Sequence, residues 1–181
     1  MSRQKRSGGL QPAMGTQCVA PVLIANRMPH VPRAELDRLC QSPVHFDALV
    51  AEEENACVFV KTVRLDDPGV ADQRITPLWP HHLPGELVIS LTGQAAYILL
   101  LRRGIIAEGW RGHGVRIRDA RFSASVLLGE TFWTRVEVAR VRRLGAKRYV
   151  QLRYRMWKLG PDGREIETYR SEQDAMFFPG A

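Results

Sequence analysis

Residues 84–101 constrain the fold more than any other part of the sequence. Drawn as a helix, this segment is apolar on almost every face. Its apolar members are Leu87, Val88, Ile89, Leu91, Ala95, Ala96, Tyr97, Ile98, Leu99 and Leu100. A helix of this kind belongs in a protein interior. Glu86, Ser90 and Gln94 are spaced four apart and therefore share one polar stripe. The sequence predicts a buried helix with a single polar stripe.

Strand patterns lie on both sides of this helix. Residues 44–50 and 57–65 read as two strands joined by a polar turn. After the helix, strands are predicted at residues 115–122, 131–141, 148–158 and 164–170. Gly160-Pro161-Asp162-Gly163 is a hairpin signal before the last of them. An α+β fold, with a curved antiparallel sheet wrapped around one central helix, satisfies this order.

The chain is expected to form one folded domain, residues 31–181, after a flexible basic arm, residues 1–30. The arm mixes Gly, Pro, Ser and basic residues without periodicity. A short helix is predicted at residues 31–40, with Pro32 near its start. A small curved sheet cannot cover so apolar a central helix unaided, so we expect at least a dimer.

Cysteine use and hydropathy bear on the compartment. Cys18, Cys40 and Cys57 are scattered, with neither disulfide-framework nor CxxC spacing, which suits a reducing environment. No apolar stretch of signal-peptide length follows the charged start. The longest apolar run, residues 95–101, falls far short of the ~20 residues of a membrane span. We expect a cytoplasmic protein that neither spans nor binds a membrane.

Several short motifs occur in a fixed order. Pro84-Gly85-Glu86-Leu87 opens the helix, and Gln94-Ala95 begins nine positions after Gly85. Ala120-Arg121-Phe122, Gly129-Glu130 and Arg142-Arg143-Leu144-Gly145 follow. The set resembles the hot-dog superfamily, above all the 3-hydroxyacyl-ACP dehydratases, whose central helix reads Pro-Gly-x-Leu with Gln-Ala in the same register. The resemblance covers roughly residues 44–178 and implies a hot-dog fold.

The sequence departs from those dehydratases at two positions. Their acid–base Glu lies four residues before the Gln, where this chain has Ser90. Their catalytic His lies nine residues before the Gly, which corresponds to Thr76. The strand order is also similar to that of FcoT-like acyl thioesterases and related enzymes acting on enoyl-ACP, which lack the usual acid. The reaction type is therefore left open.

The resemblance implies an enzyme of acyl thioesters, held on acyl carrier protein or coenzyme A, in fatty-acid or polyketide-type biosynthesis. The first hypothesis is a dehydratase-like lyase, which acts by dehydration or by conjugate addition to an enoyl group. The second is a thioesterase. The third is a non-catalytic subunit of a hot-dog heterodimer, whose partner supplies the missing Glu.

Gly85 and Glu86 are the first candidate site residues. The resemblance implies that the helix N-terminus faces the thioester carbonyl, where free N–H groups stabilise negative charge on oxygen. Gly85 would bind substrate by allowing close approach, although it could simply begin the helix. Glu86 is the only carboxylate on the stripe and could act as the base, favoured by burial. Alternatively, it is a first-turn acid that interacts with the helix dipole.

The remaining candidates surround these two. His82 could transfer protons and His81 could bind substrate, but neighbours on an extended loop point apart, so at most one acts. Ser90 could hydrogen-bond the substrate or bond back to a carbonyl. Gln94 could orient the stripe, or it could belong to the core. No His or Cys has metal-site spacing, and we expect neither a metal nor another cofactor.

The net charge of +7 suggests an acidic partner. The arginine-rich strands could dock an acidic carrier protein or a phosphopantetheine phosphate. They could equally be solvated strand faces. No recognition helix, zinc finger or RRM-type aromatic motif accompanies the charge, so nucleic acid is not an expected partner.

Overall fold

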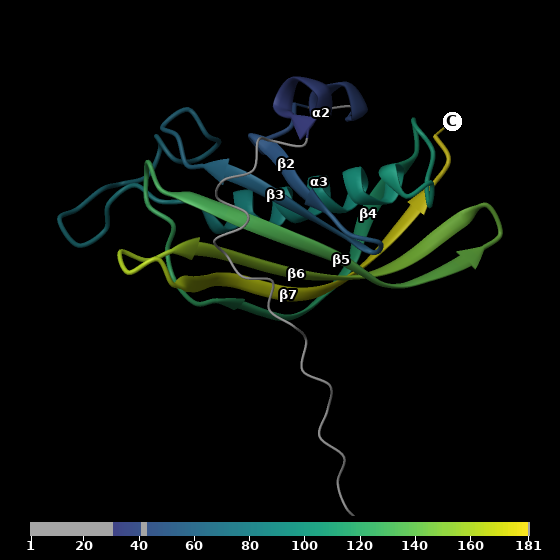
Figure 1. Ribbon diagram of the computed structural model, residues 1–181. Coiled ribbons are helices and arrows are strands. Elements are labelled where there is room, and N and C mark those ends of the chain that lie inside the picture. The colour runs from purple at the N-terminus through teal and green to yellow at the C-terminus, as the bar shows by residue number, and fades with distance from the viewer. Residues whose placement is uncertain (1–30, 41–42, 181) are drawn as a thin grey trace, which may run out of the picture.

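The computed structural model describes residues 31–40 and 43–180. The arm expected at residues 1–30, including Cys18, lies outside these described residues. The described chain forms a seven-stranded sheet and two helices (Figure 1). The elements are β1 (Val31–Pro32), α2 (Arg33–Leu39), β2 (Ala48–Glu52), β3 (Ala56–Thr62), α3 (Gly85–Arg102), β4 (Arg111–Phe122), β5 (Thr131–Leu144), β6 (Lys147–Leu159) and β7 (Glu165–Phe178).

The sheet has the order β1-β2-β3-β5-β6-β7-β4, and every neighbouring pair is antiparallel. Figure 1 shows a curved sheet with α3 lying along one face. This arrangement confirms the predicted order of two strands, one helix and four strands. The prediction missed β1, whose two residues pair with β2. The helix expected from residue 31 therefore starts at Arg33, after Pro32 in extended conformation.

Several predicted boundaries were wrong for identifiable reasons. Val44 and Phe46 are fully buried but precede β2, so their alternation reflects packing into the core and not strand pairing. β4 starts at Arg111, four residues before the first apolar residue of the predicted strand, because this glycine-containing stretch pairs with the end of β7. β7 correspondingly continues to Phe178, well beyond the predicted end at residue 170.

Helix α3 provides the central part of the core. Nine of its residues are buried: Leu87, Val88, Leu91, Thr92, Ala95, Ala96, Ile98, Leu99 and Leu100. Full burial of one large aliphatic side chain is worth about 1.5–3 kcal/mol, so the helix contributes a large share of the folding free energy. Glu86 and Ser90 remain exposed and Gln94 partly so. Neither α3 nor α2 is long and apolar enough to cross a membrane.

The C-terminal end of α3 is fastened to the turn between β2 and β3. Glu52 accepts ion pairs from Arg102 at 2.5 Å and Arg103 at 3.0 Å. Arg103 also donates to the backbone carbonyls of Glu53 and Glu54. Burial alone would raise the pKa of Glu52, but the two guanidinium groups outweigh burial and lower it. The arginines also place positive charge at the negative end of the helix dipole.

Replacing Glu52 with Gln should destabilise the protein by about 1–3 kcal/mol at pH 7, because the charge-assisted hydrogen bond from Arg103 and the ion pair with Arg102 are weakened. The native pKa of Glu52 is lowered, so its contribution is present above the unfolded-state pKa and is lost as pH falls through the native one. Urea denaturation at pH 7 and below pH 4 should therefore show the difference shrinking. Glu54→Gln, at an exposed position, is the matched control. An equal loss at both pH values would contradict this account.

Candidate active site

The N-terminus of α3 is open. Pro84 precedes the helix in extended conformation, and no side chain caps this end. The Val88 N–H bonds to the Pro84 carbonyl at 3.1 Å, whereas the three preceding N–H groups have no earlier turn to bond to. The first of these belongs to Gly85. Free N–H groups at the positive end of a helix dipole stabilise negative charge placed beside them.

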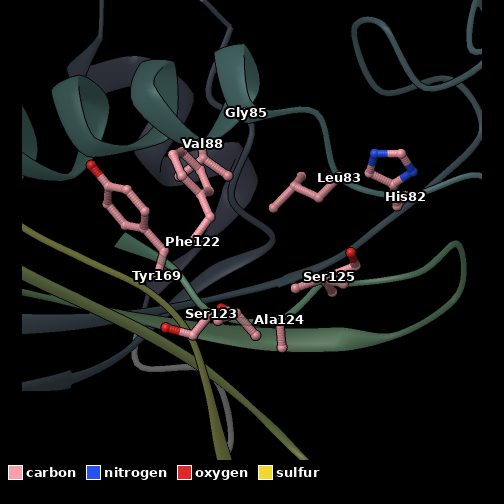
Figure 2. A pocket seen from close by; sticks show the side chains of 11 residues that line it. His82, Leu83, Gly85, Val88, Phe122, Ser123, Ala124, Ser125 and Tyr169 are labelled. Atoms are coloured by element: carbon pink, nitrogen blue, oxygen red, sulfur yellow. The ribbon is translucent and has the colours of Figure 1, made fainter. Parts of the chain in front are cut away.

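A chamber of about 400 Å³ lies beside this helix end (Figure 2). It is lined by His82, Leu83, Gly85, Val88, Phe122, Ser123, Ala124, Ser125, Val126, Thr168 and Tyr169. Figure 2 shows Gly85 and Val88 on the helix side of the chamber and Ser123 and Ala124 on the opposite side. The volume falls within the range of small-molecule sites. A mixed lining of buried apolar side chains and hydroxyl groups suits a partly apolar ligand.

His82 is held at the edge of the chamber by its backbone. Gln73 accepts the His82 N–H and donates to the His82 carbonyl, both at 2.9 Å. The next residue, Leu83, donates its N–H to the Val126 carbonyl at 2.8 Å. His82 Nδ1 lies 2.9 Å from the Pro80 carbonyl oxygen. A carbonyl can only accept, so this contact places the proton on Nδ1 and leaves Nε2 free to accept one.

The loop that carries Gln73 is itself anchored. Buried Lys61 pairs with Asp67 at 2.5 Å, and Asp67 also accepts the Arg64 N–H at 2.8 Å. Further along, the backbones of Thr76 and Trp79 exchange two hydrogen bonds, of 3.1 and 3.0 Å. The first contacts anchor the start of the loop, and the Thr76–Trp79 bonds close a turn within it. His82 therefore sits on a supported segment that can hold one geometry.

Glu86 lies on a different surface from the chamber. It lines an outer groove of about 720 Å³, with Gln73, Arg74, Trp79, His82, Pro84, Gly85, Ile89 and Phe122. The expectation that Glu86 is buried was wrong: its side chain is exposed, because the polar stripe faces away from the sheet. His82, Gly85 and Phe122 line both the chamber and the groove. These three residues mark the place where the two spaces meet.

Ser90 and Gln94 lie in a third hollow, of about 450 Å³, farther along α3. Both amide atoms of Gln94 are engaged: Oε1 accepts the His45 N–H at 2.9 Å, and Nε2 donates to the Pro43 carbonyl at 3.0 Å. These bonds tie α3 to the segment before β2, which favours the core role for Gln94. His81 lines none of the three hollows. One chain thus brings His82 and Gly85 together, with Glu86 in the adjoining groove.

The two described cysteines do not supply a nucleophile. Burial raises the pKa of Cys40 to about 11, with a further contribution from Asp37. Burial also raises the pKa of Cys57 to about 11, with a further contribution from Glu52. Both thiols are therefore protonated near neutral pH, and the thiolate is the reactive form. Within residues 31–40 and 43–180, no cluster of three or more His, Cys, Asp or Glu side chains is placed to hold a metal.

Sequence reasoning missed several residues around the site. Phe122 was noticed only as part of a strand motif, although it lines both the chamber and the groove. Ser123, Ser125 and Thr168 line the chamber from two segments far apart in the chain, so no local pattern marks them. Gln73 was not singled out from the sequence. Its spacing of nine residues from His82 carries no signal until the loop folds back on itself.

Comparisons with known proteins define the fold. The sequence matches no protein-family model and no curated protein. A dehydratase heterocomplex, ApeI:P from Xenorhabdus doucetiae, has a TM-score of 0.56 at 16% identity and covers 77% of this chain and 88% of its own. A thioesterase family protein from Silicibacter pomeroyi has a TM-score of 0.52 at 15% identity. The match covers 80% of this chain and 95% of the thioesterase family protein. A hot-dog-like protein from Thermanaerovibrio acidaminovorans has a TM-score of 0.50 at 21% identity. The match covers 68% of this chain and 81% of the hot-dog-like protein.

This chain has the hot-dog fold. The curved antiparallel sheet around a central helix, seen in the structure and in these similar proteins, confirms the fold that the sequence motifs suggested. At these identities the similarity defines the architecture of the hot-dog domain and not its reaction. The chemistry has to be argued from the residues around the α3 N-terminus.

An alanine substitution at Gly85 tests why the hot-dog domain has a glycine at the helix start, and Gly112 in β4 is the comparison position. A methyl group at Gly85 would lie 3.7 Å from the Phe122 ring, an ordinary contact, whereas one at Gly112 would overlap the buried Phe177 ring. Gly85→Ala should therefore change stability by less than about 0.5 kcal/mol. Gly112→Ala should cost about 1–3 kcal/mol. Urea denaturation of both variants distinguishes them. A large loss in Gly85→Ala would mean that packing, not access, requires this glycine.

Proposed function

We propose that this protein is an enzyme acting on acyl thioesters of acyl carrier protein or coenzyme A, with dehydratase-like lyase chemistry at the α and β carbons. One observation carries the proposal. His82, with Nε2 free to accept a proton, sits beside the uncapped N-terminus of α3 at the edge of a chamber of about 400 Å³. A proton acceptor and an oxyanion site at one point are what proton abstraction next to a carbonyl requires.

The proposed reaction uses one histidine in two steps. The thioester oxygen lies against the N–H groups at Gly85, and His82 Nε2 takes a proton from the α carbon. Negative charge then develops on the oxygen, where the helix dipole and the N–H groups stabilise it. The Cα=Cβ double bond forms as the Cβ–O bond breaks, and the leaving hydroxyl takes the proton from His82 and departs as water. The reverse sequence adds water, or another nucleophile such as an amine, to an enoyl thioester.

Thioester hydrolysis is the alternative, and the position of Glu86 supports it. Its carboxylate lies in the outer groove, next to Gly85. From there it could activate a water molecule against a carbonyl held by the same N–H groups. Similar folds include both a dehydratase heterocomplex and a thioesterase family protein, which is consistent with either reaction. A non-catalytic subunit is the third candidate, since the dehydratase relative is a heterocomplex.

A second copy of the chain, or a related hot-dog chain, is the proposed assembly partner. β4 lies at the end of the sheet, and nearly all of its residues are exposed, including Val115 and Ile117. A long edge strand with exposed apolar residues offers free backbone groups for pairing with another strand. Exposed Arg116 and Arg121 on β4 support docking of an acidic carrier protein nearby.

His82→Ala should lower turnover by roughly 10²–10⁴-fold, the usual cost of losing a general acid–base group. If the reaction is the lyase reaction, Glu86→Gln should keep a turnover close to that of the parent protein, because Glu86 lies outside the chamber. Pure protein is incubated with 3-hydroxyacyl-, enoyl- and saturated acyl-ACP, and the products are weighed by mass spectrometry. Water loss or an adduct supports the lyase.

Other outcomes of the same assay separate the alternatives. Free acid from the saturated thioester, abolished by Glu86→Gln, would establish the thioesterase instead. No conversion of any substrate without an added hot-dog partner would favour the non-catalytic subunit. Full activity of His82→Ala would contradict the role of the histidine in the lyase mechanism.

Val115→Glu combined with Ile117→Glu should convert the assembled protein to a monomer. The carboxylates would be buried without partners if β4 paired with a second chain, which is costly. Sedimentation velocity at micromolar concentration measures the change. Leu65→Glu, at an exposed apolar residue outside β4, is the control and should leave the assembly intact. A stable monomer of the parent protein would contradict pairing through β4.

A further inference from the structure

The end of the β5–β6 hairpin extends past the strand that flanks it. β5 pairs with β3 from Thr131 to Glu137, and the Val138 N–H still bonds to the Asn55 carbonyl at 2.8 Å. Within the described chain, residues 139–144 of β5 have β6 as their only partner strand. Figure 1 shows this hairpin projecting beyond the turn between β2 and β3. One edge of β5 is therefore left with unpaired backbone N–H and C=O groups.

This end of the hairpin carries positive charge without carboxylates. Residues 139–147 are all exposed, and none of them is Asp or Glu. The basic residues of this stretch are Arg140, Arg142, Arg143 and Lys147. Among the described residues, none of these four side chains has an ion-pair partner, unlike the arginines nearer the start of β5. Like charges this close together repel one another, so the cluster favours a partner that brings negative charge.

The other half of the same hairpin shows how an acidic neighbour fits against β5. Glu53, in the turn between β2 and β3, pairs with Arg135 of β5 at 2.8 Å. Glu137 of β5 pairs with Arg135 at 3.3 Å and with Arg153 of β6 at 3.6 Å. Where a neighbouring segment lies beside β5, it therefore supplies a carboxylate to an arginine of that strand. Past this segment the arginines continue and the carboxylates stop.

We propose that the free edge of β5, residues 139–144, binds an extended acidic segment of another protein, which adds to the sheet as a further strand. The backbone groups of the edge pair with those of the added segment. Arg140 and Arg142 lie opposite Gln151 and Tyr149 of β6, so their side chains share one face, about 7 Å apart. Alternate carboxylates of an added strand have the same spacing and can pair with both arginines.

Exposed apolar residues distinguish this edge from one that charge merely protects. Val141 and Leu144, which lie among the arginines, are 36% and 51% exposed and offer apolar contact to an added strand. A second copy of the same edge is disfavoured, because it would place arginines against arginines. Residues 139–147 line none of the chamber, the groove and the third hollow, so the inference does not depend on the proposed reaction.

Three labelled eight-residue peptides test the inference by fluorescence anisotropy with the full chain. The first alternates Glu and Val, the second Glu and Pro, and the third Gln and Val. The Glu–Pro peptide keeps the charge but lacks the N–H groups that strand addition needs, because proline has none. The Gln–Val peptide keeps those groups but lacks the charge. The Glu–Val peptide should bind best, and each of the other two should bind at least about tenfold more weakly.

Charge reversal on β5 locates the binding surface. Arg142→Glu should weaken binding of the Glu–Val peptide by at least about threefold, and the double variant with Arg140→Glu by about tenfold or more. Arg38→Glu makes the same change of charge at an exposed residue of α2 and is the matched control, with a Kd within about twofold of the parent. Amide hydrogen exchange at residues 139–144 should slow when the peptide is bound, because an added strand protects backbone N–H groups.

Other results would overturn the inference. Equal binding of the Glu–Val and Glu–Pro peptides would mean that charge alone attracts them and that no strand is added. Unchanged binding in the double variant, or no binding of the Glu–Val peptide to the parent, would remove the peptide from this edge. A single-stranded RNA oligonucleotide that binds more tightly than the Glu–Val peptide, and is lost in the double variant, would identify phosphate groups as the ligand in place of an acidic strand.

Discussion

The burial of one helix, apolar on nearly every side, is the constraint on which this structure depends. The strands after α3 are long, and the sheet curves so that its apolar face meets the helix (Figure 1). Even so, a single sheet covers only part of a cylinder, and the stripe through Glu86, Ser90 and Gln94 is left over. The same demand therefore shapes the sheet and leaves this polar stripe outside it.

The two ends of α3 serve different purposes. At the C-terminus, Arg102 and Arg103 pair with Glu52, so the helix dipole is compensated and the end is anchored. At the N-terminus no side chain provides a cap, which typically forgoes about 1 kcal/mol of stability. The positive end of the dipole is thereby left available beside the chamber and His82. The helix is therefore stabilised at its fastened end and less so at the end beside the chamber.

Periodicity in the sequence was sufficient for the architecture but not for the site. The apolar helix and the alternating strands are local patterns, so α3 and the order of the strands along the chain could be read directly. Val44 and Phe46 were wrongly assigned to a strand. Residues that are buried without strand pairing can show the same alternation of apolar and polar positions. Glu86 was expected inside because its stripe was placed on a helix assumed to be enclosed. Phe122 and Gln73 escaped notice because their partners are distant in sequence and no spacing links them.

The hydrogen bonds between Gln73 and His82 have a consequence for how this scaffold can change. Both bonds engage the backbone of residue 82, and neither involves the imidazole. The position in space is therefore specified separately from the chemical group that it presents. A glutamate, cysteine or tyrosine at position 82 would meet the same helix end and the same chamber without loosening the segment. A single substitution at position 82 would therefore change the side chain presented to this helix end while both backbone bonds to Gln73 are kept.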